Sequence, residues 1–135
     1  MLKLLEFEAS HRYDASADGI DDPVTLKMGR QSIDVVAKLD TGAAYCIFER
    51  RCAEVLGLDV ESGRLQRFRT VAGSFAAYEH EVTLRTLGVE FSAIVFVAQN
   101  PAGTKNFLGR SGWLDRLRVA IVDYDRMLFL SAYDS

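Results

Sequence analysis

Short runs of alternating apolar and polar residues make up most of the chain. Residues 32–39, 79–87 and 89–97 each place apolar side chains at alternate positions, which is the repeat of a β-strand with one buried face. In the third run, Ile94 and Phe96 make the other face apolar as well. We therefore predict three strands, the last of them buried on both faces near its end.

Turn signals separate these runs and add a further hairpin. Runs 118–122 and 127–131 flank a turn at 123–126 and predict two paired strands. The other turn signals each contain a glycine and fall at 18–19, 28–30, 72–74, 87–88 and 100–103. Such spacing is typical of a chain built from short strands.

Only two segments favour helix. Residues 49–56 are good helix formers and are followed by Gly57, a common helix end. Residues 111–117 could form one or two turns with Ser111 as the N-cap. An open sheet with helical crossovers would need more helices than these. We therefore predict one mostly-β domain over residues 1–135, with one or two short helices.

The composition is that of an ordinary globular domain, and it excludes some partners. The chain has 135 residues, of which 49% are apolar and 26% are charged, and its formal net charge is −3. Arg64, Arg67 and Arg69 cluster, but a solvated strand face explains them better than nucleic-acid binding does. No apolar run reaches the roughly 18 residues of a membrane span. We expect neither nucleic acid nor a membrane as a partner.

Cysteine and histidine usage points to neither a disulfide framework nor a metal site. Cys46 and Cys52 are the two cysteines, and no Cys/His spacing fits a metal. We expect both thiols to be reduced and buried, and we expect no metal or organic cofactor. Residues 1–10 carry charges and lack the apolar stretch of a signal peptide. These features favour a cytoplasmic protein.

The motif Asp40-Thr41-Gly42-Ala43 carries the candidate chemistry. An isolated aspartate titrates near pH 4 and is a poor base, but two facing carboxylates share one proton and so provide a base and an acid together. A water between them can then attack an amide carbonyl. Glycine allows close approach of the loop backbone, and the threonine hydroxyl can brace two loops across an interface.

The chain contains this motif once. The other acids lie in different surroundings, without the preceding apolar run and the following hydroxyl residue and glycine. A second carboxylate would therefore have to come from a second copy of the chain, with Asp40 beside its own equivalent on a two-fold axis. If the chain forms a carboxylate pair, the sequence predicts that it does so as a homodimer.

Three segments together resemble the retroviral-type (retropepsin-like) aspartic proteases and their bacterial single-domain relatives. They are the Asp40–Ala43 motif after an apolar strand, a hairpin around Val71–Tyr78 where the family has its substrate-covering flap, and Asn106–Arg110, similar to the family's apolar-apolar-glycine strand. A short helix at Trp113-Leu114 follows. The resemblance covers roughly residues 30–131.

The resemblance implies a closed, β-barrel-like acid-protease fold, in which a single lobe acts as a homodimer. It implies an aspartic endopeptidase that cleaves extended peptides with no metal or cofactor. The implied residues are Asp40, Thr41 and Gly42 for catalysis, Ala43, Ala44, Ala72, Gly73, Ser74 and Phe75 for substrate binding, and Leu108, Gly109 and Arg110 for support of the site.

Three departures from the family keep a second hypothesis open. Retroviral enzymes often carry an acid just after the alanine, where this chain has Ala44 and Tyr45. Arg110 would then pair with another acid, such as Asp123 or Asp125, or face water. The hairpin has one glycine rather than a glycine-rich tip. The dimer interface could also differ and use the N-terminal LKLLEFE or residues 118–131. The alternative is a catalytically weak or inactive dimer that binds peptides or a protein.

Overall fold

A computed structural model describes residues 1–16, 18–102 and 104–134. These residues form ten strands and one α-helix. The strands are β1 (Ala9–Arg12), β2 (Asp21–Met28), β3 (Gln31–Leu39), β4 (Ile47–Phe48), β5 (Leu65–Thr70), β6 (Gly73–Thr86), β7 (Val89–Ala98), β8 (Phe107–Leu108), β9 (Leu117–Val122) and β10 (Met127–Ala132). The helices are α1 (Arg50–Leu56) and the 3₁₀ turns η1 (Val60–Ser62), η2 (Leu114–Arg116) and η3 (Asp123–Asp125).

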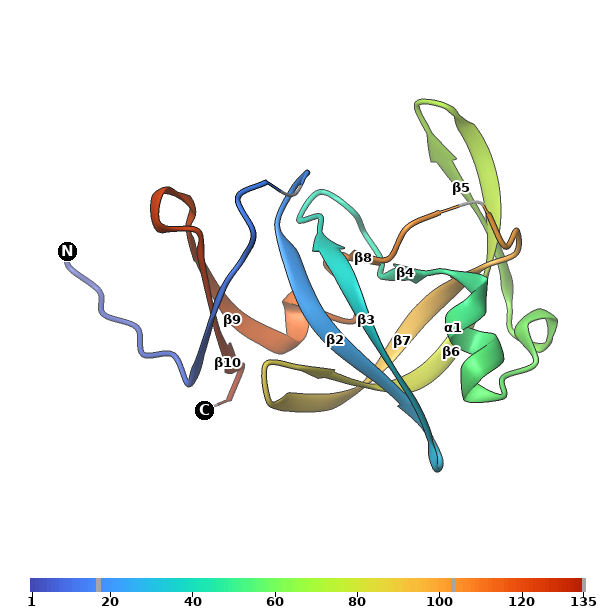
Figure 1. Cartoon of the computed structure of the whole chain (residues 1–135), viewed down its shortest axis with the longest axis horizontal. Coiled ribbons are helices and arrows are strands. Elements are labelled where there is room, and N and C mark those ends of the chain that lie inside the picture. Colours follow the sequence, from blue (N-terminus) through green and yellow to red (C-terminus); the bar gives the residue numbers. More distant parts are fainter. Residues whose placement is uncertain (17, 103, 135) are drawn as a thin grey trace.

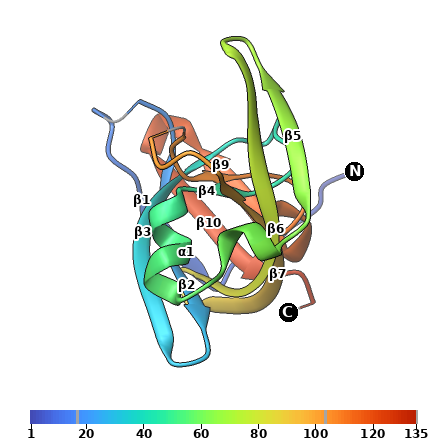
Figure 2. The same ribbon diagram turned by 90° about the vertical axis from the view of Figure 1, so that its right-hand side faces the viewer.

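Six of the strands close into a ring. The main sheet has the order β2-β3-β8-β4-β7-β6-β5, and β2 also pairs with β6. The ring is therefore β2-β3-β8-β4-β7-β6, and β5 extends from it as one arm of a hairpin (Figures 1 and 2). A second sheet, β1-β10-β9, lies beside the barrel. The predicted closed, mostly-β fold is confirmed.

The predicted strands form where the alternation placed them, with one error. Residues 118–122 and 127–131 pair as β9 and β10, and β7 buries Phe96 on its second face. Ile94 on that same face is 44% exposed, so the prediction of burial there was wrong. Phe96 is covered because it packs edge-on against Tyr45 and Phe68, whereas this aromatic contact does not reach Ile94.

Helix α1 confirms the prediction for residues 49–56. It ends at Gly57, whose left-handed φ of 74° lets its N–H bond to the carbonyls of Ala53 and Glu54. Its buried face consists of Cys52, Ala53 and Leu56. The helix therefore closes one end of the barrel, packing against β2, β3 and β7.

The prediction that Ser111 caps a helix was wrong. The segment forms only the 3₁₀ turn η2, which follows Trp113 and has no side-chain cap. Ser111 instead makes an isolated parallel bridge with Tyr45, and its N–H donates to the carbonyl of Ala44 at 2.8 Å. That long-range pairing overrides the local capping preference, because it holds the segment against the loop after Asp40.

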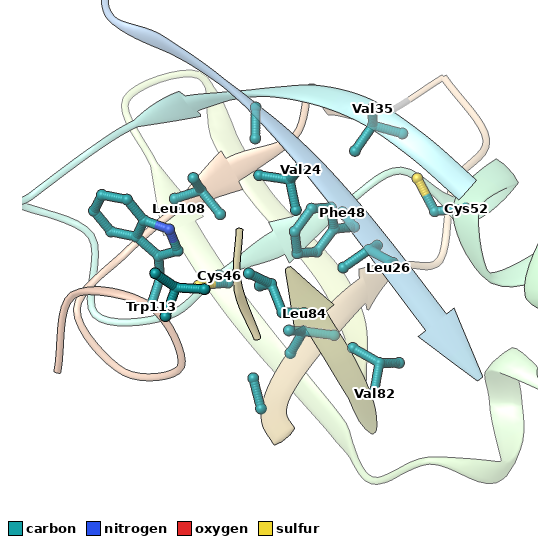
Figure 3. Close-up of a cluster of buried hydrophobic side chains, with 14 of the residues drawn as sticks. Val24, Leu26, Val35, Cys46, Phe48, Cys52, Val82, Leu84, Leu108 and Trp113 are labelled. Atoms are coloured by element: carbon teal, nitrogen blue, oxygen red, sulfur yellow. The ribbon is translucent and has the colours of Figure 1, made fainter. Parts of the chain in front are cut away.

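The core lies inside the ring of strands. Phe48, Leu26, Leu84 and Leu108 are almost fully buried there, and Trp113 closes the end nearest β8 (Figure 3). Both cysteines are free and buried, as predicted. Within the described ranges, no helix has the length and apolar character needed to cross a bilayer. The predicted turn at 100–103 includes Gly103, which lies outside the described residues.

One carboxyl group is buried with this core. Asp22 on β2 is fully buried, and its Oδ2 accepts a hydrogen bond from the hydroxyl of Thr86 on β6. Its other oxygen, Oδ1, has no hydrogen-bond partner among the described residues. Burial raises the pKa of Asp22 to about 6, against the lowering effect of the Thr86 hydrogen bond.

Candidate active site

The loop that follows β3 presents Asp40 to solvent. The Asp40 N–H donates to the carbonyl of Leu108 at 2.9 Å, and the Ala43 N–H returns to the carbonyl of Asp40 at 3.0 Å, which closes a tight turn. Inside this turn the Gly42 N–H donates to Asp40 Oδ1 at 3.1 Å. The carboxylate is thus oriented by its own loop. Because Asp40 is exposed, the carboxylate remains accessible to a ligand.

Strand β8 supports this loop from below. It lies between β3 and β4, parallel to β3 with Leu39 opposite Leu108, and antiparallel to β4 with Ile47 opposite Phe107. The N–H of Arg110 then donates to the carbonyl of Ala43 at 2.9 Å. Residues far apart in the sequence therefore fix both ends of the Asp40 loop.

Gly109 is required for this contact. A Cβ atom at Gly109 would overlap the carbonyl oxygen of Tyr45 and lie 2.8 Å from the carbonyl oxygen of Ala43. Both obstacles are backbone atoms and cannot rotate away. The Gly109 N–H also points at Cys46 Sγ, 3.4 Å away. Any side chain at position 109 would therefore push β8 away from the loop.

Gly42 and Thr41 have no comparable constraint within one chain. A Cβ atom at Gly42 would meet Asp40 Oδ1 at 3.4 Å, an ordinary contact distance, and φ of Gly42 lies outside the left-handed region. Thr41 is exposed, and its hydroxyl bonds to none of the described residues. Both residues are open toward solvent beside Asp40.

Cys46 lies close to the loop, but its surroundings make it a packing residue. It is fully buried, and burial raises the pKa of its thiol to about 11. A thiol with so high a pKa stays protonated near neutral pH and is a poor nucleophile. Its sulfur instead fills the space between β8 and the segment at Ser111, whose carbonyl lies 3.6 Å away.

A cleft of about 1110 Å³ opens over Asp40. Of the residues proposed from the sequence, Asp40, Gly42, Ala43, Ala44 and Phe75 line it. The remaining lining residues come from the loop after Asp40, from β4, from β5 and from the segment before and within β8: Tyr45, Ile47, Gln66, Arg67, Phe68, Arg69, Thr70, Ala102, Thr104, Lys105 and Phe107. Most of these residues were not anticipated from the sequence.

The hairpin β5–β6 projects from the barrel (Figure 2), and residues of β5 form part of the cleft wall. Its two-residue turn is Val71-Ala72, so the turn predicted at 72–74 is shifted by one residue. Gly73 instead begins β6 opposite Thr70, where its φ of 137° helps to close the turn. Ala72, Gly73 and Ser74 are exposed near the tip and do not line the cleft.

Aromatic rings connect the base of this hairpin to the Asp40 loop. Phe68 stacks on Phe75 across the two strands, with ring centroids 5.3 Å apart. Tyr45, five residues after Asp40, meets Phe68 and Phe96 edge-on at 6.0 Å and 4.9 Å. These contacts fix the base of the hairpin beside the Asp40 loop. In the sequence, the alternation of Phe68 with its polar neighbours is the signal that could have identified Phe68 as a site residue.

Arg110 takes neither of the acidic partners considered from the sequence. Its side chain is exposed and forms no ion pair with a described residue. The Asp123 carboxylate accepts a hydrogen bond from Tyr13, and the Asp125 carbonyl accepts one from Arg12 at 2.8 Å. Arg110 therefore faces water, the remaining alternative. Among the described residues, no three His, Cys, Asp or Glu side chains gather as a metal site requires.

A closed ring of short strands, an aspartate loop seated on an inserted strand and a hairpin over the cleft define the acid-protease class of fold. The chain belongs to the aspartyl protease family, whose family model, described as "Aspartyl protease", matches residues 23–112. Family and fold together support a protease-type function. No curated protein sequence matches the chain significantly.

Solved structures with this fold are similar to the chain at low sequence identity. A retropepsin-like aspartic protease from Rickettsia conorii superposes with a TM-score of 0.65 and 17% identity, over 90% of this chain and 96% of that chain. The EIAV protease complexed with the inhibitor HBY-793 gives a TM-score of 0.55 and 20% identity, over 73% and 86%. At these identities the matches establish the retropepsin-like fold.

Proposed function

We propose that the chain is an aspartic endopeptidase that acts as a homodimer, with Asp40 of each copy forming the catalytic pair. The observation that carries this proposal is the position of Asp40, which is exposed at the cleft and held by Gly42 and Leu108 backbone groups. Asp40 is also the one acid among the described residues that line the cleft. A second carboxylate would come from a second copy.

The proposed chemistry follows from two carboxylates that share one proton. The ionised Asp40 removes a proton from a water, and the oxygen of that water attacks the peptide carbonyl. The protonated Asp40 of the partner copy donates its proton to the carbonyl oxygen. Proton transfer to the amine nitrogen then allows the C–N bond to break, which releases an acid and an amine.

The open surroundings of Asp40 favour the dimer. Within one chain Gly42 has room for a Cβ atom and the Thr41 hydroxyl has no partner among the described residues. A second loop that approaches on a two-fold axis would explain both features. Glycine allows the two backbones to come close, and the threonine hydroxyl can form a hydrogen bond across the interface. Leu108, Gly109 and Arg110 would support each loop through their backbone contacts.

An extended peptide fits the proposed site as an added strand. β5 is the last strand of its sheet, so one of its edges has unpaired N–H and C=O groups. A peptide lying between this edge and the Asp40 loop would pair with the hairpin by β-augmentation. Ala43, Ala44 and Phe75 would contact its side chains, and the tip residues Ala72–Ser74 would cover it on closure.

The alternative function is a dimer that binds peptides without cleaving them. It is favoured by Ala44 at the position where retroviral enzymes often carry an acid, and by Arg110, which has no ion-pair partner among the described residues. Loss of that ion pair would leave the loop less firmly braced. The two functions predict the same fold and the same cleft, so only an activity measurement separates them.

The decisive experiment measures peptide cleavage by the wild type and by Asp40→Asn. A diverse peptide pool is incubated between about pH 3 and about pH 7, with and without pepstatin, because a shared proton requires acidic to neutral conditions. Asp59→Asn, at an exposed acid outside the cleft, is the matched control. Endopeptidase function predicts inhibitable cleavage that Asp40→Asn abolishes and Asp59→Asn retains. Equal cleavage by the Asp40 variant, or a strictly monomeric active protein in light scattering, would refute the proposal.

A further inference from the structure

The cleft has a charge opposite to that of the whole chain. Arg67 and Arg69 on β5 and Lys105 before β8, here called the cleft cations, line it and are all exposed. Asp40 is the one acid among the described residues in the lining. The chain as a whole has a formal net charge of −3, so the excess of cations is local to the cleft.

The cleft cations are not engaged elsewhere in the described structure. None of them forms a side-chain hydrogen bond or an ion pair with a described residue. Lys27, by contrast, pairs with Glu90 at 2.8 Å, and Arg50 pairs with Glu61 at 2.5 Å. Lys27 and Arg50 thus have acidic partners, whereas the cleft cations remain available to a ligand.

The cleft cations come from two different segments of the cleft wall. Phe68 faces the aromatic cluster, and strand geometry puts its neighbours Arg67 and Arg69 on the other face of β5. Lys105 comes from a different segment of the wall, two residues before Phe107 on β8. A peptide with its backbone at Asp40 would therefore extend its side chains toward positive charge in more than one direction.

We infer that the cleft selects peptides with glutamate or aspartate near the cleaved bond, with Arg67, Arg69 and Lys105 as the residues that set this preference. The inference rests on the proposed function, because it uses the same cleft. A peptide meets Asp40 with its neutral backbone and meets the cleft cations with its acidic side chains. A polyanion such as a nucleic acid would bring phosphates to Asp40 as well, and Phe68 and Phe75 already stack on each other rather than standing free for bases.

The expected preference is moderate and depends on salt. An exposed ion pair contributes roughly a two- to fivefold effect, so two acidic side chains give on the order of tenfold in kcat/KM. Because the charges are exposed, the effect should fall steeply as ionic strength rises above about 0.1 M. A purely structural role for these arginines and this lysine would produce no such dependence on salt or on peptide charge.

The test compares peptide pairs that differ only by Glu-to-Gln replacement on either side of the cleaved bond. Kinetics are measured for the wild type, for Arg67→Glu with Arg69→Glu, and for Lys105→Glu, at low and high salt. Arg30→Glu, at an exposed position in the β2–β3 turn outside the cleft, is the matched control. The wild type and the control should prefer the Glu peptide about tenfold at low salt. The double arginine reversal should prefer the Gln peptide, and Lys105→Glu, which leaves both arginines in place, should weaken the Glu preference.

A binding measurement keeps this test separate from the test of catalysis. Fluorescence anisotropy with the Asp40→Asn protein reports the affinity for the Glu and Gln peptides whether or not cleavage occurs. Cleavage without a Glu preference would overturn the inference and leave the endopeptidase proposal standing. Absence of all cleavage, with tighter binding of the Glu peptide, would overturn the endopeptidase and support the selectivity. If a reversed variant misfolds, Arg67→Gln with Arg69→Gln replaces it. A single-stranded oligonucleotide that binds more tightly than the Glu peptide would also refute the inference.

Discussion

Replacing Asp22 by asparagine should make the free energy of unfolding depend less on pH. Asp22 is fully buried between β2 and β6, with one oxygen bonded to the Thr86 hydroxyl and the other without a partner among the described residues. An ionised carboxylate in such a place has lost its hydration and gained one hydrogen bond. Burial therefore raises the pKa of Asp22 to about 6 in the folded protein.

The sign and size of the effect follow from proton linkage. Because the folded pKa lies above the ordinary value of 3.8, the folded state binds the proton more tightly than the unfolded state. The stabilisation by protonated Asp22 is complete below about pH 4 and is lost as the pH rises through about 6. The pKa difference of about 2 units, at about 1.36 kcal/mol per unit, corresponds to about 3 kcal/mol of unfolding free energy.

Urea denaturation measures this directly. Trp113 is the one tryptophan in the chain and is buried, so its fluorescence reports unfolding. Between about pH 4 and about pH 7 the wild type should lose about 2 to 3 kcal/mol relative to Asp22→Asn. The amide adds a cost that does not vary with pH. The exposed Asp59→Asn variant is the control for loss of a carboxylate charge, and protein concentration is held constant because any association of copies would contribute to stability.

A difference between the wild type and Asp22→Asn that stays constant across this pH range would refute the reasoning. It would mean that Asp22 titrates alike in the folded and unfolded chains, so that water reaches Oδ1. A difference of the opposite sign would mean that a cation compensates the buried charge.

Three further predictions concern the loop and its support. Gly109→Ala should destabilise the fold by about 2 kcal/mol or more and reduce peptide cleavage, because its Cβ atom would overlap the Tyr45 carbonyl. The control Gly29→Ala, with open space around it and only a left-handed φ of 59°, should cost about 1 kcal/mol and keep cleavage. Equal losses of unfolding free energy in urea denaturation would contradict this prediction. Asn106→Ala should cost about 2 kcal/mol, because it removes the acceptor of the Glu49 N–H at 2.9 Å; an unchanged urea midpoint would show that water replaces the side chain. Wild type and Asp40→Asn are mixed in equal amounts, with time for the subunits to exchange, and compared with wild type alone at the same total concentration. If each dimer needs two aspartates, the mixture should cleave at about a quarter of the wild-type rate. A rate of about half would indicate that each chain acts alone.

The barrel strands could be predicted because their signal is local. The alternation in β3, β6 and β7 depends only on which face of each strand meets the core, and Gly57 ends α1 through its own backbone conformation. The Asp40 loop was also recognisable, since its turn is formed by adjacent residues. These features need no knowledge of the rest of the chain.

The features that sequence reasoning missed depend on contacts between distant segments. The local sequence predicts Ser111 as a helix N-cap, but Ser111 forms a β-bridge with Tyr45 instead. No sequence pattern singles out Asp22, yet it is buried against Thr86, 64 positions away. Lys105 joins the arginines of β5 only because both segments border the cleft. No local pattern of polarity contains these pairings.

The way the Asp40 loop is held explains how the fold can persist at 17% to 20% identity. Its anchors are backbone groups: the Leu108 carbonyl accepts from Asp40, and the Ala43 carbonyl accepts from the N–H of Arg110. Side chains can change without breaking such bonds, provided that β8 can come close enough. Gly109 is the residue that allows this approach, because its neighbours are themselves backbone atoms. Selection on the loop geometry would therefore constrain Gly109 and Asp40, and would leave the walls of the cleft free to change charge and substrate preference.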